Sequence, residues 1–258
     1  IVEPEEGPLA SGRSGQGRLA DEARILSALQ ATLHPRRDWS GRRLLISAGP
    51  TQEAIDPVRF ISNRSSGKMG YALAEAAQAR GAEVLLVSGP TALTPPAGVE
   101  LCPVTTAEEM RKAVISRFSW SDTVIMAAAV ADFRPTQPAA QKLKKRRSPV
   151  TSLELSPTDD ILRELGERRT TQVLVGFAAE TEDLLAHARE KLQAKGVDLL
   201  VANDVTAAGS GFGSDTNRVF ILDRDGRAEE LPLLPKREVA DRILDRVLTL
   251  PTGRRSTK

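Results

Sequence analysis

The segment from Asp56 to Gly70 brings hydroxyl, amide and cationic side chains to the start of an apolar helical repeat. The first turn of a helix has unpaired backbone N–H groups and the positive end of the helix dipole, so it can bind phosphate or carboxylate. Ser65, Ser66 and Gly67 would let a ligand approach the backbone closely, and the two hydroxyls would add donors. An ordinary serine N-cap accounts for the segment equally well.

Five segments rich in small, polar and acidic residues follow expected strands, where a doubly wound parallel sheet binds its ligands. They lie at 47–53, 88–91, 127–132, 176–181 and 202–205. Loops between strands and helices are generally rich in such residues, so one segment alone would indicate little. Five together favour a nucleotide-binding crevice.

Three charged residues are candidates for contacts with a nucleotide. Asp132 ends an apolar run, and a carboxylate in such a place often holds Mg²⁺ that bridges phosphates. Lys191 and Lys195 are four residues apart and therefore share one face of an expected helix. A solvent-exposed helix end is the alternative interpretation of that pair.

The basic run from Lys142 to Arg147 follows a proline-rich stretch. Such a run is typical of a solvated face. A nucleic-acid patch would include interleaved aromatic residues, which make up only 3% of this chain. The remaining alternative is a mobile flap whose lysines close on a polyphosphate.

Two nucleotide-binding motifs can be tested directly, and both fail. In a P-loop, Ser62 would have to be glycine and Met69 serine or threonine. After the first expected strand, the segment from Ala48 to Thr51 lacks the second and third glycines of the dinucleotide fingerprint. A plain NAD dehydrogenase is therefore disfavoured.

Composition narrows the class further. The 258 residues are 40% hydrophobic with a net charge of +2, which fits one large or two small domains and gives no global attraction to nucleic acid. Cys102 is the single cysteine, which fits a reducing compartment. The two histidines, His34 and His187, argue against a serine–histidine triad or a histidine-rich zinc site. With no apolar run of about 20 residues and no signal peptide pattern, we expect a cytoplasmic protein without membrane contact.

Strand and helix patterns alternate along most of the chain. Strands are expected at 43–47, 83–88, 123–130, 172–177 and 198–202, and helices at 21–33, 67–80, 106–118, 159–168, 182–195 and 236–250. The pair Asp225-Gly226 between 218–223 and 227–233 predicts a hairpin. This order predicts an α/β fold: a Rossmann-like, mostly parallel, doubly wound sheet with helices on both faces and an antiparallel hairpin near the C-terminus.

Seven motifs in order give the chain a family resemblance from about Arg42 to Leu248. They are Gly49-Pro-Thr-x-Glu53, the segment Asp56–Gly70, Ala127-Ala-Ala-Val-Ala-Asp-Phe133, Lys142-x-Lys-Lys145, Gly176-Phe-Ala-Ala-Glu-Thr181, Ala202-Asn-Asp204 and Gly211-Phe-Gly-Ser-Asp-x-Asn217. Together they resemble the phosphopantothenoylcysteine synthetase family, the phosphopantothenate–cysteine ligases of bacterial coenzyme A biosynthesis.

The resemblance implies a two-step ligation. CTP activates the carboxylate of 4′-phosphopantothenate as an acyl-cytidylate and releases pyrophosphate, and the amine of L-cysteine then displaces CMP. It also implies Mg²⁺ on the triphosphate and a homodimer. CTP in preference to ATP comes from the resemblance alone. A non-catalytic nucleotide-binding subunit of the same fold and an NAD(P) oxidoreductase remain the alternatives.

The resemblance also assigns site residues. Asn63 would act on the acyl-cytidylate, where an amide N–H can hold an oxyanion, and Lys142 would reach the nucleotide and support activation. Nucleotide-binding positions would be Gly49, Ser65, Ser66, Gly67, Ala128, Asp132, Asp159, Asp160, Ile161, Leu162, Phe177, Lys191 and Lys195. Asp132 would hold the metal through the triphosphate. The family usually has Asn-Pro-Asp-Ile where this chain has Thr158 to Ile161, so the proline of that turn is missing.

The N-terminal segment carries a second resemblance. Pro8 to Arg18 resembles the substrate clamp of the flavin-dependent phosphopantothenoylcysteine decarboxylase, with Ser11 where the clamp usually has a proton-donating cysteine. The chain begins at Ile1, so we expect the carboxyl-terminal part of a bifunctional protein, with FMN only in the upstream domain. Residues 1–40 would be a poorly ordered tail and linker, 41–250 the ligase domain and 251–258 a disordered tail.

Overall fold

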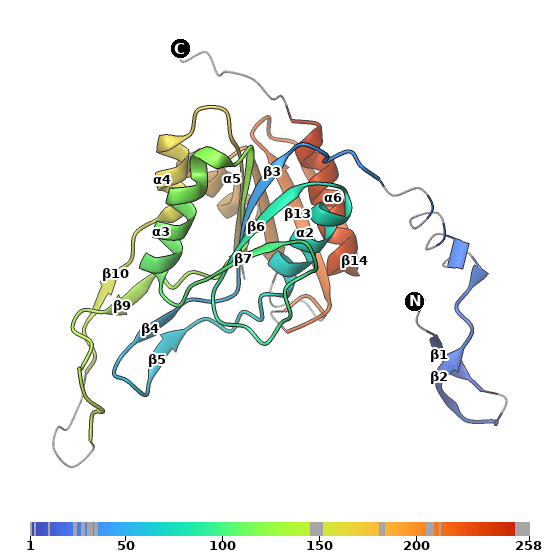
Figure 1. The fold of residues 1–258 in the computed structure, drawn as a ribbon, viewed down its shortest axis with the longest axis horizontal. Coiled ribbons are helices and arrows are strands. Elements are labelled where there is room, and N and C mark those ends of the chain that lie inside the picture. The colour runs from blue at the N-terminus through green and yellow to red at the C-terminus, as the bar shows by residue number, and fades with distance from the viewer. Residues whose placement is uncertain are drawn as a thin grey trace.

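A large mixed sheet forms the body of the protein in the computed structural model (Figure 1). The structure describes residues 2, 4–9, 11–22, 25–26, 29, 33, 36–144, 152–180, 184–204, 209–211 and 213–250. In these residues the sheet has eight strands in the order β14-β13-β12-β11-β8-β3-β6-β7. The tail at 251–258, much of the helix expected at 21–33, and Lys145 to Arg147 of the basic run lie outside the described residues.

Six strands of this sheet are parallel and two are antiparallel. The parallel strands are β3 (Arg43–Ala48), β6 (Glu83–Ser88), β7 (Glu100–Pro103), β8 (Thr123–Met126), β11 (Val173–Glu180) and β12 (Leu199–Asp204). The antiparallel strands are β13 (Thr216–Asp223) and β14 (Ala228–Pro235), joined by the turn predicted at Asp225-Gly226. The predicted sheet and its C-terminal hairpin are confirmed.

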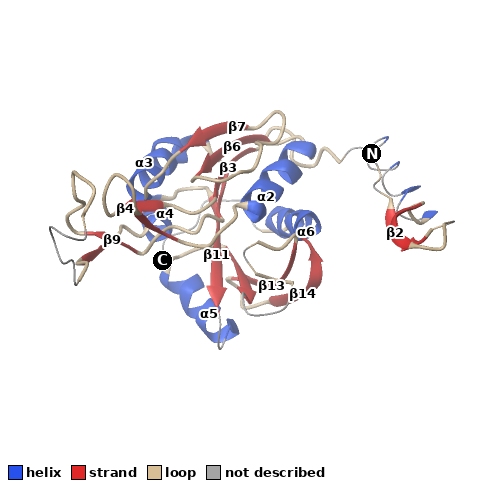
Figure 2. Ribbon diagram, turned by 90° about the horizontal axis from the view of Figure 1, so that it is seen from below, coloured by secondary structure: helices blue, strands red, loops and turns tan. Residues whose placement is uncertain are grey.

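Helices cover both faces of the sheet, as the alternating pattern predicted (Figure 2). The helices are α2 (Lys68–Ala79), α3 (Ala107–Arg117), α4 (Ile161–Arg168), α5 (Leu184–Ala194) and α6 (Lys236–Leu248), with a short 3₁₀ turn, η1 (Phe118–Trp120), after α3. Buried residues of α2 and α6 belong to one apolar cluster, and those of α3, α4 and α5 to another. The two clusters lie on opposite faces of the sheet and fix α2 beside α6.

The start of α2 differs from an ordinary serine N-cap. The N-cap residue is Gly67, whose φ of 81° suits glycine, and no side chain caps the helix. Ser65 Oγ instead accepts a hydrogen bond from Gly67 N at 3.3 Å. A Cβ on Gly67 would lie 2.7 Å from Thr91 Cγ2, so this position has room only for glycine.

Strand β8 is shorter than its apolar run predicts. The expected strand covered 123–130, but β8 ends at Met126. The chain then bonds to the loop after β3: Ala129 N donates to Gly49 O at 2.9 Å, and Thr51 N donates to Ala129 O at 3.2 Å. The backbone groups of this apolar segment are therefore satisfied by another loop, which places 127–131 at the carboxyl edge of the sheet.

Two small hairpins project together from the body, and a third is formed by the N-terminal segment (Figure 1). The projecting pair are β4 (Gln52–Ala54) with β5 (Phe60–Ser62), and β9 (Phe133–Pro135) with β10 (Leu155–Pro157). The N-terminal hairpin pairs β1 (Glu5–Pro8) with β2 (Ser14–Arg18). We call the segment between β9 and β10 the flap; it includes Lys142.

The packed body includes residues ahead of position 41. Trp39 is fully buried in the cluster formed by α2 and α6, and its backbone N–H donates to Arg80 O at 3.1 Å. Two ion pairs extend this attachment: Asp38 pairs with Arg80, and Arg36 pairs with Asp245. The proposed domain limits, and the poor order expected for 1–40, stay predictions.

Candidate functional site

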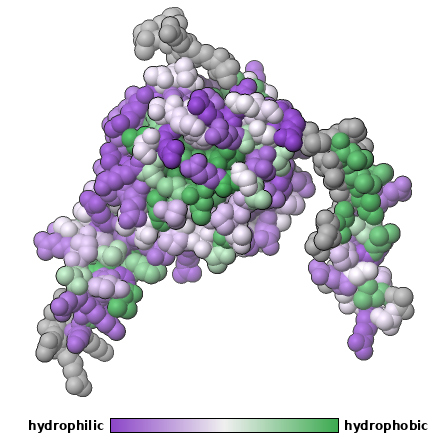
Figure 3. Space-filling view, in the orientation of Figure 1, coloured by the Kyte–Doolittle hydropathy of each residue, from purple (hydrophilic) through white to green (hydrophobic). Residues whose placement is uncertain are grey.

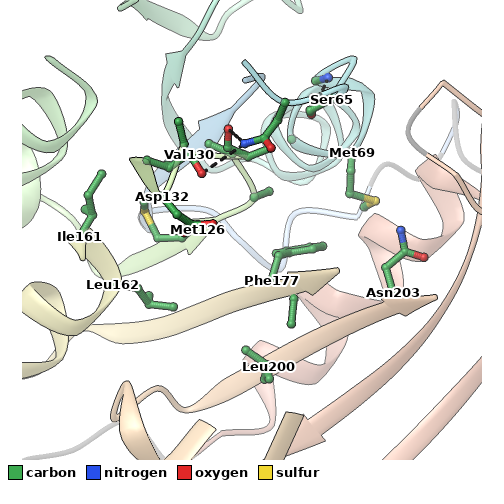
Figure 4. A pocket seen from close by; sticks show the side chains of 18 of the residues that line it. Ser65, Met69, Met126, Val130, Asp132, Ile161, Leu162, Phe177, Leu200 and Asn203 are labelled. Carbon is green, nitrogen blue, oxygen red and sulfur yellow. Dashed lines mark hydrogen bonds between the residues drawn. The ribbon is translucent and has the colours of Figure 1, made fainter. Parts of the chain in front are cut away.

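A cavity of about 670 Å³ lies at the carboxyl ends of β8, β11 and β12, beside the start of α2 (Figure 4). Residues far apart in the chain line it. The predicted site residues among them are Asn63, Ser65, Ser66, Gly67, Ala128, Asp132, Asp159, Asp160, Ile161, Leu162, Phe177, Lys191 and Lys195. The tertiary structure therefore brings together all of the predicted residues except Gly49 and Lys142.

Gly49 lies behind the wall of this cavity. It has φ of 74°, and a Cβ here would lie 2.9 Å from Thr91 Cγ2 and 3.0 Å from Gly89 O. Its own carbonyl accepts from Ala129 N. Gly49 thus lets the loop after β3 pack directly beneath Gly67 and supports the lining from behind.

Asn63 is fixed against the loop that follows β8. Its Nδ2 donates to Ala129 O at 3.0 Å and to Val130 O at 3.2 Å. Carbonyl oxygens can only accept, so the amide nitrogen of Asn63, and not its oxygen, faces them. A ligand oxygen that accepts from the Asn63 amide would therefore compete with these two carbonyls.

One end of the cavity combines carboxylates with lysines. Asp160 caps α4 by accepting from Arg163 N at 3.1 Å, and its other carboxylate oxygen forms an ion pair with Lys195. Lys195 therefore points into the cavity wall at α4, and the alternative of a merely solvent-exposed helix end does not describe it. Asp132 and Lys191 line the same end.

The turn that lacks the family's proline is held by hydrogen bonds instead. Thr158 Oγ1 donates to Ala131 O at 2.6 Å, and Thr158 N donates to Asp132 O at 2.9 Å. Two residues later Asp160 caps α4. The turn is thereby fixed to the loop after β8 at one side and to the helix at the other.

The middle of the cavity is apolar. Figure 4 shows Phe177 and Met126 between Ile161 and Leu162 on one side and Asn203 on the other. A ligand that spans the cavity therefore crosses apolar surface between two polar ends. Apolar lining with a few polar groups is usual for small-molecule binding sites.

The second polar end contains residues that sequence reasoning missed or set aside. Lys68 Nζ donates to Gly213 O at 2.8 Å and pairs with Asp215 Oδ1 at 2.7 Å, and Lys236 Nζ donates to the carbonyl of Ser214. Lys68 stands where a P-loop would have its lysine, but the rest of that motif is missing. Lys236 carried no signal beyond its position at the start of an expected helix. Asn203 and Asn217 also line this end.

Two charged groups at this end, Lys236 and Asp215, have lowered pKa values for different reasons. Burial lowers the pKa of Lys236, and the charge of Lys68 lowers it further. The pKa of Asp215 lies below its usual value because Lys68 donates a hydrogen bond to it. The surroundings of Lys236 therefore disfavour its protonated form.

Lys142 lies outside the cavity of its own chain. It is exposed in the flap, next to Leu143, whose N–H donates to Asp56 Oδ2 at 3.1 Å and whose carbonyl accepts from Arg59 Nη2 at 3.1 Å. These bonds tie the flap to the β4–β5 hairpin. Hydrogen bonds from Arg59 hold the pKa of Asp56 far below its usual range. Within one chain, Lys142 thus agrees with the solvated-face alternative.

Metal binding can be judged from the carboxylates present. The described residues contain no cluster of three or more His, Cys, Asp or Glu side chains suited to a metal ion. Mg²⁺ in nucleotide sites usually needs only one or two protein carboxylates, with phosphate and water supplying the other ligands. The exposed carboxylate of Asp132 in the cavity lining fits that requirement.

Among the described residues, no helix is both long and apolar enough to cross a bilayer.

The chain is therefore an α/β protein with a cavity at the carboxyl edge of a doubly wound sheet, where proteins of this fold class bind their ligands. Residues 39–250 match the family of the DNA/pantothenate metabolism flavoprotein C-terminal domain, and the chain belongs to this family. The resemblance predicted from the seven motifs is thereby confirmed.

Relatives and solved structures agree with this assignment. The chain is 51% identical over 263 residues to the coenzyme A biosynthesis bifunctional protein CoaBC of Bacillus subtilis, covering 99% of this chain and 64% of that protein. The crystal structure of the C-terminal domain of a CoaBC is 47% identical, with a TM-score of 0.71 over 82% of this chain and 96% of that one. A Cab2 mutant in complex with phosphopantothenate-cysteine, 20% identical, shares the fold with a TM-score of 0.66 over 85% and 89% of the two chains.

Proposed function

We propose that this chain is a CTP-dependent ligase that joins L-cysteine to 4′-phosphopantothenate through an acyl-cytidylate. Membership of the family supports this, and so does the convergence of the predicted residues on one cavity, which is the observation that carries the proposal. The cytoplasmic location expected above is part of it. In a bifunctional parent, FMN would belong to the upstream decarboxylase and not to these residues.

The polar end at α4 is the proposed nucleotide site. Lys191 and Lys195 would offset the charge of the triphosphate, and Asp132 would hold Mg²⁺ against it. Bound Mg²⁺ would supply charge neutralisation on the departing pyrophosphate. Phe177 would contact the nucleotide from the apolar middle of the cavity.

Asn63 would act where the two steps meet. It lies between the α2 start and the loop after β8, and its amide already serves two carbonyl oxygens. An acyl oxygen that gains charge during cysteine attack would compete for one of these N–H groups. Loss of such a donor typically slows a reaction about 10²–10³-fold.

Lys142 would act in a second copy of the chain. Val58, Phe60, Phe133 and Leu155 are exposed apolar residues on the two hairpins that flank the flap, and apolar surface is visible where these hairpins project (Figure 3). A contiguous exposed apolar patch commonly marks an interface. A second copy covering these hairpins would form the expected homodimer and could receive the flap lysine in its cavity.

Release of pyrophosphate tests the ligase directly. It should require CTP, Mg²⁺ and 4′-phosphopantothenate together, and CMP should follow when cysteine is added. In Asn63→Asp the acyl-cytidylate should accumulate, because the first step proceeds while the second is slowed. CTP binding without any pyrophosphate release would instead support a non-catalytic subunit, and tight NADPH binding by calorimetry would support an oxidoreductase.

Mixing two inactive variants tests the placement of Lys142. Lys142→Gln and Asn63→Asp each inactivate a different residue of the site. If the flap acts on the partner, a mixed dimer contains one intact site, with Asn63 from the Lys142→Gln subunit and Lys142 from the Asn63→Asp subunit. Activity should therefore return on mixing and subunit exchange. If the mixture stays as inactive as its components, Lys142 acts within its own chain or not at all.

A further inference from the structure

The loop at 127–132, after β8, connects three parts of the cavity. Ala128 and Asp132, both predicted to bind the nucleotide, belong to this loop and line the cavity. The amide of Asn63 donates to two carbonyls in the middle of the loop. Thr158, at the turn before α4, donates to two further carbonyls near its end. The position of the loop therefore determines how these groups lie relative to one another.

Two buried hydroxyl groups hold this loop from behind. Ala128 N donates to Ser47 Oγ at 3.1 Å, and Ala131 N donates to Thr51 Oγ1 at 2.9 Å. Ser47 lies in β3, Thr51 lies in the segment that follows β3, and neither residue has exposed surface. The described lining of the cavity includes neither of them. A buried N–H without an acceptor is unfavourable, so loss of either hydroxyl should make the loop move.

Thr51 is also bonded to the segment that carries Asn63. Its carbonyl accepts from Ser62 Oγ at 2.8 Å, and Ser62 directly precedes Asn63 in the chain. On the other side, Thr51 N donates to Ala129 O at 3.2 Å. Backbone groups of Thr51 make both of these bonds, so they can persist when its side chain is changed. The hydroxyl can therefore be removed while the residue stays in place.

We propose that Ser47 and Thr51 are positioning residues, whose hydroxyls hold the loop at 127–132 where the transfer of the acyl group to cysteine requires it. The inference rests on the proposed function, which assigns Asn63 to this transfer. A displacement of about 1 Å can slow a reaction about a hundredfold. Lys191 and Lys195 line the cavity from outside the loop and would keep most of the affinity for CTP. Loss of a hydroxyl should therefore lower kcat more than it raises KM for CTP.

The experiment compares Thr51→Val, which keeps the shape of the side chain, with Thr51→Ser, which keeps the hydroxyl. In Thr51→Val, kcat for CMP release with cysteine should fall about tenfold to a hundredfold, and KM for CTP should change less than about threefold. Thr51→Ser should retain most of the wild-type kcat. Ser47→Ala should change the two constants in the same direction as Thr51→Val.

Hydrogen exchange followed by mass spectrometry measures the loop without turnover. The peptide that contains 127–132 should exchange faster in Thr51→Val and in Ser47→Ala than in the wild-type chain, because one of its N–H groups has lost its acceptor. In Thr51→Ser its exchange should stay close to that of the wild-type chain.

Ser121→Ala is the matched control. Ser121 is also buried, and its Oγ donates to Phe118 O at 2.9 Å. It precedes β8, at the end of the strand away from the loop. Ser121→Ala thus removes a buried hydroxyl without touching 127–132. Its kcat, and the exchange of the loop, should equal those of the wild-type chain.

Two results would overturn the inference. One is a wild-type kcat in both Thr51→Val and Ser47→Ala; the other is a loss of kcat in Ser121→Ala as large as in Thr51→Val, which would indicate a general loss of stability. If Thr51→Val does not fold, Ser47→Ala and Thr51→Ser give the answer. A wild-type chain that releases no pyrophosphate would refute the ligase, whereas faster exchange at 127–132 in both variants would still support the hydroxyls as the groups that position the loop.

Discussion

Two clusters of charged side chains, both reached by α2 and α6, differ in how their charges are matched. In the first, which we call the closed cluster, Arg80 is 3% exposed and bonds to Asp38, Asp241 and Asp245. The second, the open cluster, consists of Lys68, Lys236 and Asp215. With Arg36 and Arg237, which pair with the same aspartates, the closed cluster has three cations and three carboxylates, whereas the open cluster has two cations and one carboxylate.

The pKa shifts show the same contrast. Burial by itself lowers the pKa of Arg80, but hydrogen bonds to Asp38 and Asp245 outweigh it, and the net pKa is raised. Burial lowers the pKa of Lys236 as well, and there the nearby Lys68 adds to the effect. Similar burial thus leads to opposite outcomes. A fully matched cluster stabilises the fold, whereas an unmatched one is suited to binding a ligand.

The largest effect is expected when the closed cluster is broken. Arg80→Met should lower the free energy of unfolding by about 3–5 kcal/mol, because it removes the one buried cation among the three aspartates and leaves only the more exposed Arg36 and Arg237 beside them. Urea denaturation measures this. The exposed Arg237→Gln should change it by less than about 1 kcal/mol. If the two substitutions cost the same, the closed cluster is no more structural than a surface ion pair.

Removing the buried cation of the open cluster should change the free energy of unfolding only slightly. Lys236→Met removes one hydrogen bond to Ser214 O, worth about 1 kcal/mol, but it also removes the cost of burying an unpaired cation. The net change in unfolding free energy should therefore stay within about 1 kcal/mol, or be favourable. Urea denaturation beside Arg80→Met makes the comparison. A loss as large as that of Arg80→Met would erase the proposed difference between the clusters.

The smallest effects are opposite pH dependences. Arg80 and Arg36 lower the pKa of Asp38, so its contribution to stability is present above the ordinary value of 3.8 and is lost as pH falls below it. The lowered pKa of Lys236 means that the unfolded chain binds this proton more readily, so stability rises as pH rises towards 10.5. Unfolding free energies across pH for Asp38→Asn and Lys236→Met should each lose one of these slopes. If a variant keeps the pH dependence that its substitution should remove, another group causes that pH dependence.

Sequence reasoning predicted the sheet and many of the residues that line the cavity for a simple reason. Parallel strands place their following loops at one edge, so a list of these loops is already a list of cavity residues. It could not predict the loop after β8, whose apolar residues read as strand, because that loop satisfies its backbone through Gly49 and Thr51. Nor could it show that Asn63 bonds to this loop.

The sequence by itself determined the family, the alternation of strands and helices, and the small polar loops that form the cavity. Only the tertiary structure decided the rest. Lys68 and Lys236 lie at the starts of two helices far apart in the chain, and they meet because α2 and α6 bury their apolar faces in one cluster. Lys142, a prominent residue in the sequence, lies outside the cavity because Asp56 and Arg59 hold its flap to the β4–β5 hairpin. Packing, which no local pattern encodes, determined that Lys68 and Lys236 line the cavity and that Lys142 does not.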